Sequence, residues 1–292
     1  MGSEYTTPGI FFRPATSASR RSRYSSRTAA KYSGPTVYRA AEPTWSMVAE
    51  HRRPWHHFMY PDVLNLYGDN GNIICLRRRL EWRHIGCQVT RLPIGEKARL
   101  ADCDIVFIGG GQDFEQEVLL DDLHRGKDAE IRSAVADGKT FLTICGGYQM
   151  LGNYYETHEG VRCDFIGAVD LYTVGSDTRM IGNYKYRCLP SSGGSVVVGF
   201  ENHSGKTYLG PDVRALGEVL SGFGNNGEDK TEGARYKNVF GTYSHGPLLP
   251  KNPEFCDYLI KTALEHKYGA AELQPLSDGA EKLAHETMDE RI

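Results

Sequence analysis

Short apolar runs alternate with amphipathic stretches along the first half of the chain. Uninterrupted apolar runs predict buried strands, whereas apolar residues spaced three or four apart among charged ones predict helices that bury one face. By this pattern we expect strands at residues 89–92, 104–108 and 141–144 and helices at residues 73–85 and 128–137. Strands that alternate with helices predict an α/β fold with a mostly parallel sheet flanked by helices.

The second half of the chain is richer in strand-forming residues. Strands are expected at residues 194–200, 207–209 and 238–243, followed by a long closing helix at residues 252–268. Residues 269–292 form a polar C-terminal tail, which we expect to be a surface helix or frayed.

The beginning of the predicted domain fits this pattern poorly. Residues 51–59 read His-Arg-Arg-Pro-Trp-His-His-Phe-Met, and charges, histidines and Pro54 are unfavourable in a central parallel strand. We therefore expect the first strand to be short or poorly formed.

Residues 1–55 differ from the rest of the chain in composition. Ser, Thr, Arg and Ala dominate, and nine Lys and Arg residues stand against three Glu. Because such a segment has too few apolar residues to form a core, we predict a disordered basic Ser/Arg-rich extension before a single catalytic domain at residues 56–268. Three interpretations stay open: a transit peptide, a basic interaction tail, or non-native upstream sequence with Met47 as the true start.

Composition argues against several classes of function. The 292-residue chain has a net charge of −3, so no general nucleic-acid-binding surface is expected. Its seven cysteines are scattered without a Cys-x-x-Cys pair, which argues against a disulfide framework or a zinc site and favours a reducing cytosol. No apolar run approaches the ~20 residues that cross a membrane.

The most informative position is Cys145. It lies where an apolar run changes into Gly146-Gly147 and then into a helix-compatible stretch. A cysteine at such a strand-to-helix corner is exposed beside backbone N–H groups, and a helix N-terminus favours its reactive thiolate. An isolated cysteine at a strand end is more often a small buried side chain. The two glycines favour a nucleophile here.

A thiolate nucleophile needs an acid–base partner, and His245 is the best candidate. It follows the predicted strand at 238–243 directly, and sites in α/β sheets gather at the carboxyl ends of strands. His203 is the runner-up. Arg179 is a candidate to bind a carboxylate, because a guanidinium group grips carboxylates with two hydrogen bonds.

A run of three glycines, residues 109–111, follows the predicted strand at 104–108. Such a run can direct backbone N–H groups at a developing negative oxygen, with the N–H of Gly146 as a second donor. The alternative is a phosphate-binding or merely tight loop, but the spacing of a nucleotide P-loop is absent.

Five segments between residue 60 and about residue 268 carry a family resemblance. They are Tyr60-Pro-Asp-Val-Leu-Asn-Leu-Tyr-Gly-Asp-Asn-Gly-Asn72, Phe107-Ile-Gly-Gly-Gly-Gln-Asp113, Ile144-Cys-Gly-Gly-Tyr-Gln149, Gly199-Phe-Glu-Asn-His-Ser-Gly205 and Gly241-Thr-Tyr-Ser-His-Gly-Pro-Leu-Leu-Pro-Lys-Asn-Pro253. Together they resemble the class I glutamine amidotransferase family, in its cobyric-acid-synthase-like branch. Within that branch they resemble the glutaminase subunits of lipid II isoglutaminyl synthases.

The resemblance implies a mechanism and a set of roles. It places the α-carboxylate of L-glutamine on Arg179, nucleophilic attack on the side-chain amide at Cys145, and general acid–base catalysis at His245. The oxyanion would be held near Gly110 and Gly146. Many members of the class have a glutamate two residues after the histidine. Pro247 occupies that position here, so we expect a Cys–His dyad with any third group unidentified.

The resemblance also implies a heterodimer. Ammonia would pass to a MurT-like subunit of the Mur-ligase family, which uses ATP and Mg to amidate the D-glutamate α-carboxylate of lipid II. This chain would need no cofactor or metal, and would act in the bacterial cytoplasm at the inner face of the membrane.

Two other functions stay open. Corrinoid amidation is disfavoured because cobyric acid synthases usually carry a synthetase domain on the same chain. A non-catalytic scaffold of the same fold is disfavoured by the presence of Cys145, His245 and the glycines.

Overall fold

The computed structural model describes residues 55–61, 64–111, 119–189 and 193–292. The predicted N-terminal extension, residues 1–55, therefore lies outside the described residues apart from its last position.

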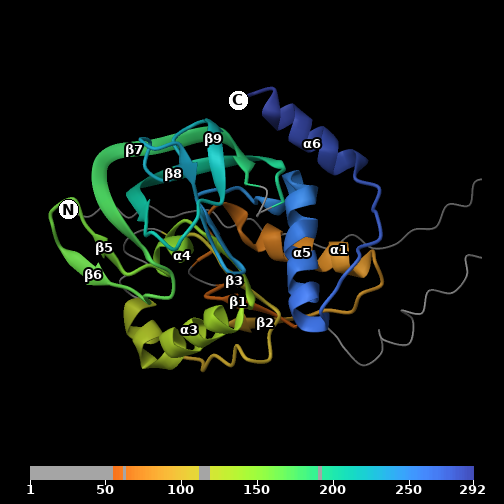
Figure 1. The fold of residues 1–292 in the computed structure, drawn as a ribbon, viewed down its shortest axis with the longest axis horizontal. Coiled ribbons are helices and arrows are strands. Elements are labelled where there is room, and N and C mark those ends of the chain that lie inside the picture. Colours follow the sequence, from red (N-terminus) through yellow and green to blue (C-terminus); the bar gives the residue numbers. More distant parts are fainter. Residues whose placement is uncertain (1–54, 62–63, 112–118, 190–192) are drawn as a thin grey trace, which may run out of the picture. The chain divides into compact units, whose positions relative to one another are not determined.

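A six-stranded sheet in the order β11-β12-β4-β3-β1-β2 positions the rest of the domain (Figure 1). Its strands are β1 (Trp55–Met59), β2 (Gln88–Leu92), β3 (Ile105–Ile108), β4 (Thr140–Ile144), β11 (Ala234–Tyr236) and β12 (Val239–Thr242). All neighbours run parallel except β11 and β12, which are antiparallel. The predicted α/β fold with a mostly parallel sheet is confirmed.

Helices α1 (Asn70–Glu81), α3 (Asp128–Asp137) and α5 (Pro253–Tyr268) pack their apolar faces on this sheet. Helix α3 has the predicted bounds, and Gly138 ends it in the left-handed conformation that glycine adopts at no steric cost. Helix α1 begins three residues before the predicted start, because the polar turn Asp69-Asn70 already belongs to its first turn. Single-turn helices are η1 (Leu66–Gly68), η2 (Leu123–Lys127), α4 (Gly146–Gln149) and η4 (Leu249–Lys251).

The expectation of a poorly formed first strand is wrong. Strand β1 pairs in parallel with β2 over five residues and with β3 over four, so it lies inside the sheet. Parallel pairing is made by backbone N–H and C=O groups, which histidine supplies as well as any other non-proline residue. Pro54, the residue that lacks an N–H, precedes the strand in the sequence.

A second sheet is mostly antiparallel and was not predicted as a separate layer. Strand β7 (Leu171–Cys188) is its long central member and pairs with β8 (Val196–Leu209), which joins the two strands predicted at 194–200 and 207–209 into one. The smaller strands are β5 (Tyr154–Glu156), β6 (Arg162–Asp164), β9 (Gly217–Ser221) and β10 (Thr231–Glu232).

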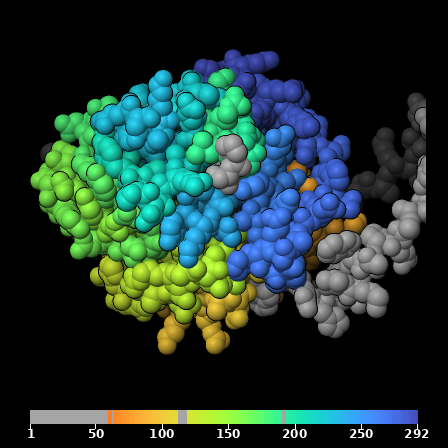
Figure 2. Space-filling view, viewed as in Figure 1, coloured from red at the N-terminus to blue at the C-terminus, as the bar shows by residue number. Residues whose placement is uncertain are grey.

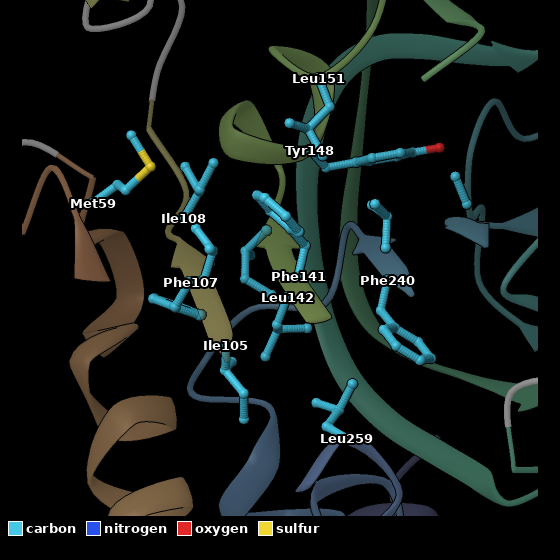
Figure 3. Packing of buried hydrophobic residues seen from close by; sticks show 14 of the residues in the cluster. Met59, Ile105, Phe107, Ile108, Phe141, Leu142, Tyr148, Leu151, Phe240 and Leu259 are labelled. Atoms are coloured by element: carbon cyan, nitrogen blue, oxygen red, sulfur yellow. The ribbon is translucent and has the colours of Figure 1, made fainter. Parts of the chain in front are cut away.

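Large apolar side chains fill the space around β3, β4 and β12 (Figure 3). Phe107, Phe141, Leu142 and Phe240 have no exposed surface, and Leu259 of α5 packs against them. Each such side chain contributes about 1.5–3 kcal/mol when fully buried. This packing holds the carboxyl ends of the three strands in fixed relative positions.

The polar tail is tied to the domain. Helix α6 (Gly279–Asp289) lies next to β8 and η4, and the space-filling view shows this segment, in dark blue, along the edge of the cyan strands (Figure 2). Arg79 of α1 is 1% exposed and binds Asp257 of α5 at 2.6 Å and Asp278, just before α6, at 2.7 Å. The tail is therefore partly a surface helix, one of the two predicted outcomes.

The buried cation Arg79 gives a first prediction. Arg79→Met would leave Asp278 without its ion-pair partner and Asp257 with Arg83 alone, and should lower the free energy of unfolding by about 1.5–3 kcal/mol, because charge-assisted hydrogen bonds of partly buried carboxylates are lost. Urea unfolding monitored by circular dichroism measures this change. Arg78→Met, one residue earlier and largely exposed, should leave the midpoint where it is. Equal shifts for both variants would contradict the assignment.

Candidate active site

Cys145 is the first residue after β4, and its backbone is strained. Its φ of 47° and ψ of −109° are unfavourable for a residue with a Cβ, and it directly precedes helix α4. Its N–H donates to Thr242 O of β12 at 2.9 Å, and its C=O accepts from Gln149 N of α4. The predicted strand–turn–helix corner is present, but the expectation of an exposed cysteine is wrong, because Cys145 is buried with 6% of its surface exposed.

The turn after β3 packs directly against the turn after β4, backbone against backbone. A Cβ on Gly147 would come within 2.6 Å of Gly109 O, and a Cβ on Gly109 would come within 2.1 Å of Leu64 O. Side chains larger than hydrogen therefore do not fit at either position. The glycines of the two motifs are needed to bring both turns together beside Cys145.

His245 lies at the same edge of the sheet. It follows β12, the parallel neighbour of β4, and its N–H donates to Phe200 O of β8 at 2.8 Å. The side chain is 1% exposed, and neither ring nitrogen has a hydrogen-bond partner among the described residues. Burial, followed by electrostatic repulsion from His203 and Arg179, lowers the pKa of His245 to about 3. The imidazole is therefore neutral at physiological pH.

Arg179 reaches this site through a short relay of polar contacts. The register of β7 against β8 shifts between Gly175 and Met180, and this bulge includes Arg179. Its Nε donates to Asn202 Oδ1 at 2.6 Å, and Asn202 Nδ2 donates to the Tyr67 hydroxyl. The Tyr67 ring lies 4.8 Å from the His245 ring, centroid to centroid. Arg179 is exposed, and its terminal nitrogens make no hydrogen bond to the described residues.

Gly110 lies between His245 and Asp69. A Cβ on Gly110 would come within 2.6 Å of His245 Cε1, so the bare backbone packs on the imidazole edge. The Gly110 N–H, predicted to bind the oxyanion, donates to Asp69 Oδ2 at 2.7 Å in this structure. Gly146, the other predicted donor, begins α4, where helix N–H groups have no intrahelical acceptor. Both donor roles stay predictions.

The loop that follows His245 is fixed to the start of α1. A Cβ on Gly71 would come within 2.5 Å of the Pro247 ring, and Asn72 Oδ1 accepts the N–H of Leu249 at 2.9 Å. Pro247 thus packs on the Tyr67-Gly-Asp-Asn-Gly-Asn72 segment. This contact joins two motifs that lie far apart in the sequence.

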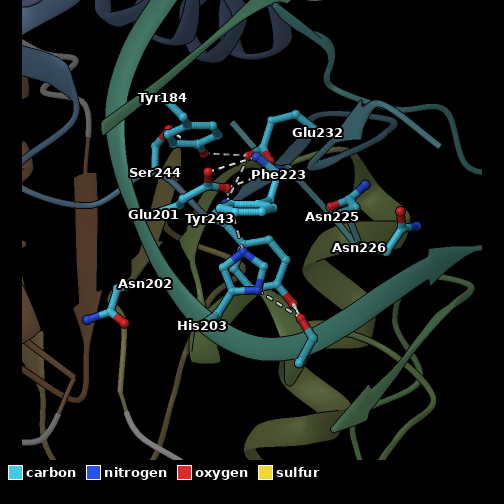
Figure 4. A network of polar contacts seen from close by, with 12 residues as sticks. Tyr184, Glu201, Asn202, His203, Phe223, Asn225, Asn226, Glu232, Tyr243 and Ser244 are labelled. Carbon is cyan, nitrogen blue, oxygen red and sulfur yellow. Dashed lines mark hydrogen bonds and ion pairs between the residues drawn. The ribbon is translucent and has the colours of Figure 1, made fainter. Parts of the chain in front are cut away.

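A buried polar network joins residues of β8 to those that follow β12 (Figure 4). The His203 ring stacks on Tyr243 with centroids 3.5 Å apart, and its Nδ1 contacts Gly205 O at 2.8 Å. The Tyr243 hydroxyl lies 2.6 Å from the Thr207 hydroxyl and accepts a hydrogen bond from Gln149 of α4. His203, the runner-up from the sequence, therefore belongs to this network, which is joined to α4 through Tyr243 and Gln149.

Glu232 anchors the end of β12. Its Oε1 accepts from Thr242 Oγ1 at 2.6 Å and from Tyr243 N at 2.9 Å. Complete burial raises its pKa to about 7. Glu232, Tyr67 and Asp69 were not singled out in the sequence. Tyr67 and Asp69 belong to the distinctive Tyr67–Asn72 motif, but Glu232, between Thr231 and Gly233, stands in no comparable motif.

Two other features of the described residues were considered as possible sites, a metal-binding cluster and a surface hollow. No three His, Cys, Asp or Glu side chains cluster as metal ligands in the described ranges. A hollow of ≈ 290 Å³ lies between the start of α5 and α6, lined by residues including Asn252, Glu254 and His285. It is away from Cys145 and contains none of the predicted site residues.

Comparisons with known proteins agree with the family resemblance seen in the sequence. Residues 57–253 match the family described as CobB/CobQ-like glutamine amidotransferase domain. The chain is 43% identical over 241 residues to the lipid II isoglutaminyl synthase (glutamine-hydrolyzing) subunit GatD of Staphylococcus aureus, covering 82% of this chain and 96% of that protein. It is 40% identical to the subunit of the same name from Streptococcus pneumoniae, covering 72% of this chain and 80% of that one.

More distant similarities concern parts of larger proteins or the fold alone. The cobyric acid synthase of Mycolicibacterium gilvum is 33% identical over 155 residues, which are 51% of this chain and only 28% of that enzyme. The structure of PurLQS from Thermotoga maritima superposes with a TM-score of 0.51 at 14% identity, covering 74% of this chain and all of that one. The latter likeness supports the α/β fold.

The buried imidazole gives a second prediction. Because the pKa of His245 is about 3 in the folded chain and 6.5 for an ordinary histidine, the folded chain binds fewer protons than the unfolded chain between these values. His245 therefore contributes stability that is complete above pH 6.5 and is lost as the pH falls towards 3. Imidazole ¹⁵N NMR should show a neutral ring at pH 5.5, with the resonance assigned by its absence in His245→Gln. A ring that titrates near 6.5 would show that it is solvated instead.

Proposed function

Because this chain belongs to the CobB/CobQ-like glutamine amidotransferase family, we propose that it is the glutaminase subunit of a lipid II isoglutaminyl synthase. The observation that carries the proposal is the similarity to GatD over nearly the whole of that subunit, 96% of its length. Cys145 and His245, at the ends of adjacent parallel strands, provide the chemistry that such a subunit needs.

The reaction begins with proton transfer from the Cys145 thiol to His245, which is neutral in the resting site. The thiolate attacks the side-chain amide carbon of L-glutamine and forms a tetrahedral intermediate. The His245 imidazolium then protonates the amide nitrogen, the C–N bond breaks, and ammonia leaves behind a thioester on Cys145. Water, deprotonated by His245, attacks the thioester and releases glutamate and the free thiol.

The remaining groups bind and orient glutamine. Arg179 presents terminal nitrogens beside the site and would hold the α-carboxylate, while Asn202 and Tyr67 fix its side chain. The oxyanion would be stabilised by the N–H of Gly146 and by that of Gly110, which then shares its hydrogen with Asp69. The strained backbone at Cys145 keeps the nucleophile directed at this point.

Ammonia release makes sense in this role only with an acceptor on another chain. We infer a heterodimer with a MurT-like subunit of the Mur-ligase family, which would bind ATP and Mg and activate the D-glutamate α-carboxylate of lipid II. The assembly would work at the cytoplasmic face of the membrane through its lipid substrate. In the described part of the chain, no helix is long and apolar enough to cross a membrane.

Corrinoid amidation is the weaker candidate. The matching region of the cobyric acid synthase of Mycolicibacterium gilvum is 28% of that enzyme, so the synthetase portion of such a protein has no counterpart in the aligned part of this chain. The GatD subunits, by contrast, are matched over 80% of their length or more.

The nucleophile is tested by Cys145→Ala in the complex with a MurT-like subunit. Glutamate release from L-glutamine should fall below about 10⁻³ of the wild-type rate, because thioester formation is lost. Amidation of lipid II with glutamine should stop, whereas amidation with added ammonium salt should continue. Cys163→Ala, a half-buried cysteine on β6, is the matched control and should stay active. Undiminished release from Cys145→Ala would end the thioester proposal.

The carboxylate-binding role is tested by Arg179→Lys. Lysine cannot make the bidentate hydrogen bonds of arginine. The KM for glutamine should therefore rise about 10- to 100-fold with a smaller change in kcat, because a charge-assisted hydrogen bond contributes roughly 1.5–3 kcal/mol. Arg162→Lys, on an exposed part of β6, serves as the control. A wild-type KM in steady-state glutaminase assays would remove Arg179 from the substrate site.

A further inference from the structure

Asp69 is a buried acid at the centre of the site whose bonding is incomplete. Its side chain has no exposed surface, although it belongs to the turn that begins α1. Oδ2 accepts the Gly110 N–H at 2.7 Å, and Oδ1 has no hydrogen-bond partner among the described residues. A buried carboxyl oxygen without a partner costs free energy, so its retention calls for a reason beyond folding.

The carboxyl group lies next to the acid–base histidine. The position that a Cβ on Gly110 would take is 3.3 Å from Asp69 Oδ2, 3.2 Å from His245 Nδ1 and 2.6 Å from His245 Cε1. One point beside Gly110 is therefore within 3.3 Å of atoms of both side chains. The ring of Tyr67 also lies near His245, with the centroids 4.8 Å apart, and His203 and Arg179 are close enough to lower the pKa of His245.

The neighbours of His245 make its protonated form unfavourable. Burial and electrostatic repulsion from His203 and Arg179 disfavour the imidazolium, yet proton transfer from the Cys145 thiol must create it. A negative charge close to the ring would offset this cost. Glu201, another buried acid of this region, already uses both oxygens to accept the N–H groups of Phe223 and Gly224.

We propose that Asp69 is a positioning residue of this active site. Its carboxylate holds the turn after β3 against His245 through the Gly110 N–H, and it supplies the charge that balances the His245 imidazolium. The inference rests on the proposed glutaminase function and adds a role to it.

Protonation of Asp69 would then control the rate near neutral pH. Burial raises the pKa of this carboxyl group to about 7, against the smaller opposing effect of the Gly110 hydrogen bond. Below that pH the group is neutral and cannot balance the imidazolium, whereas above it the charge is present. kcat should therefore rise with pH through about 7 in the wild-type complex.

The decisive variant is Asp69→Asn, assayed as glutamate release by the complex with the MurT-like subunit from pH 6 to pH 9. The amide oxygen can still accept the Gly110 N–H, so the turn is kept while the charge is lost. At pH 8.5 kcat should fall about 100-fold, since acid–base catalysis by one side chain contributes about that factor. The KM should change little. The ratio of wild-type to variant kcat should shrink as the pH falls below 7, because wild-type Asp69 is then neutral as well.

Controls separate this role from a structural one. Asp278→Asn removes one carboxylate away from the site and should keep the wild-type pH profile. If Asp69→Asn does not fold, Asp69→Glu keeps the charge but moves it, and should shift the acid limb of kcat along the pH axis. A wild-type kcat in Asp69→Asn, a ratio independent of pH, or an unshifted limb in Asp69→Glu would each overturn the proposal.

The two hypotheses fail in different ways. An inactive wild-type complex, with no glutamate released at any pH, would refute the glutaminase function itself. An active wild-type complex together with an equally active Asp69→Asn complex would refute only the role of Asp69.

Discussion

The site depends on the contact between backbone turns at the carboxyl edge of the parallel sheet. The turn after β3 touches both the nucleophile turn after β4 and the ring of His245, at distances that leave no room for a Cβ on Gly147 or Gly110. Because β3, β4 and β12 are held by a fully buried core, these turns cannot move apart without disrupting it. The glycines and the apolar strands together place Cys145 and His245 at the same edge of the parallel sheet.

Electrostatics adds a second constraint, because burial favours the neutral forms of three ionisable groups in this region. His245 has a lowered pKa, and the carboxyl groups of Asp69 and Glu232 have raised ones, each because burial penalises charge. Charges that appear during thioester formation are therefore created in an environment with little solvent to screen them. In such surroundings a nearby carboxylate or guanidinium has a larger effect than it would have in water.

The antiparallel sheet completes the site by bringing residues that the parallel sheet lacks. The bulge in β7 carries Arg179, and β8 supplies Asn202, which connects Arg179 to Tyr67 near the start of α1. Strand β8 also provides the backbone oxygen of Phe200 that binds the N–H of His245. Substrate binding and acid–base chemistry are thereby linked through one strand, although their residues are far apart in the sequence.

Local sequence determined the strands and helices whose patterns are strong, and the corner at Cys145. Apolar runs identified β3 and β4, Gly138 marked the end of α3, and the Gly-Gly pair after Cys145 indicated the nucleophile turn, since these features follow from backbone sterics within a few residues. Only the tertiary structure decided the position of β1 inside the sheet, the continuity of β7 across its polar residues, and the meeting of Asp69 with Gly110 and His245. Those outcomes depend on backbone pairing and on contacts between segments distant in sequence, which no local pattern encodes.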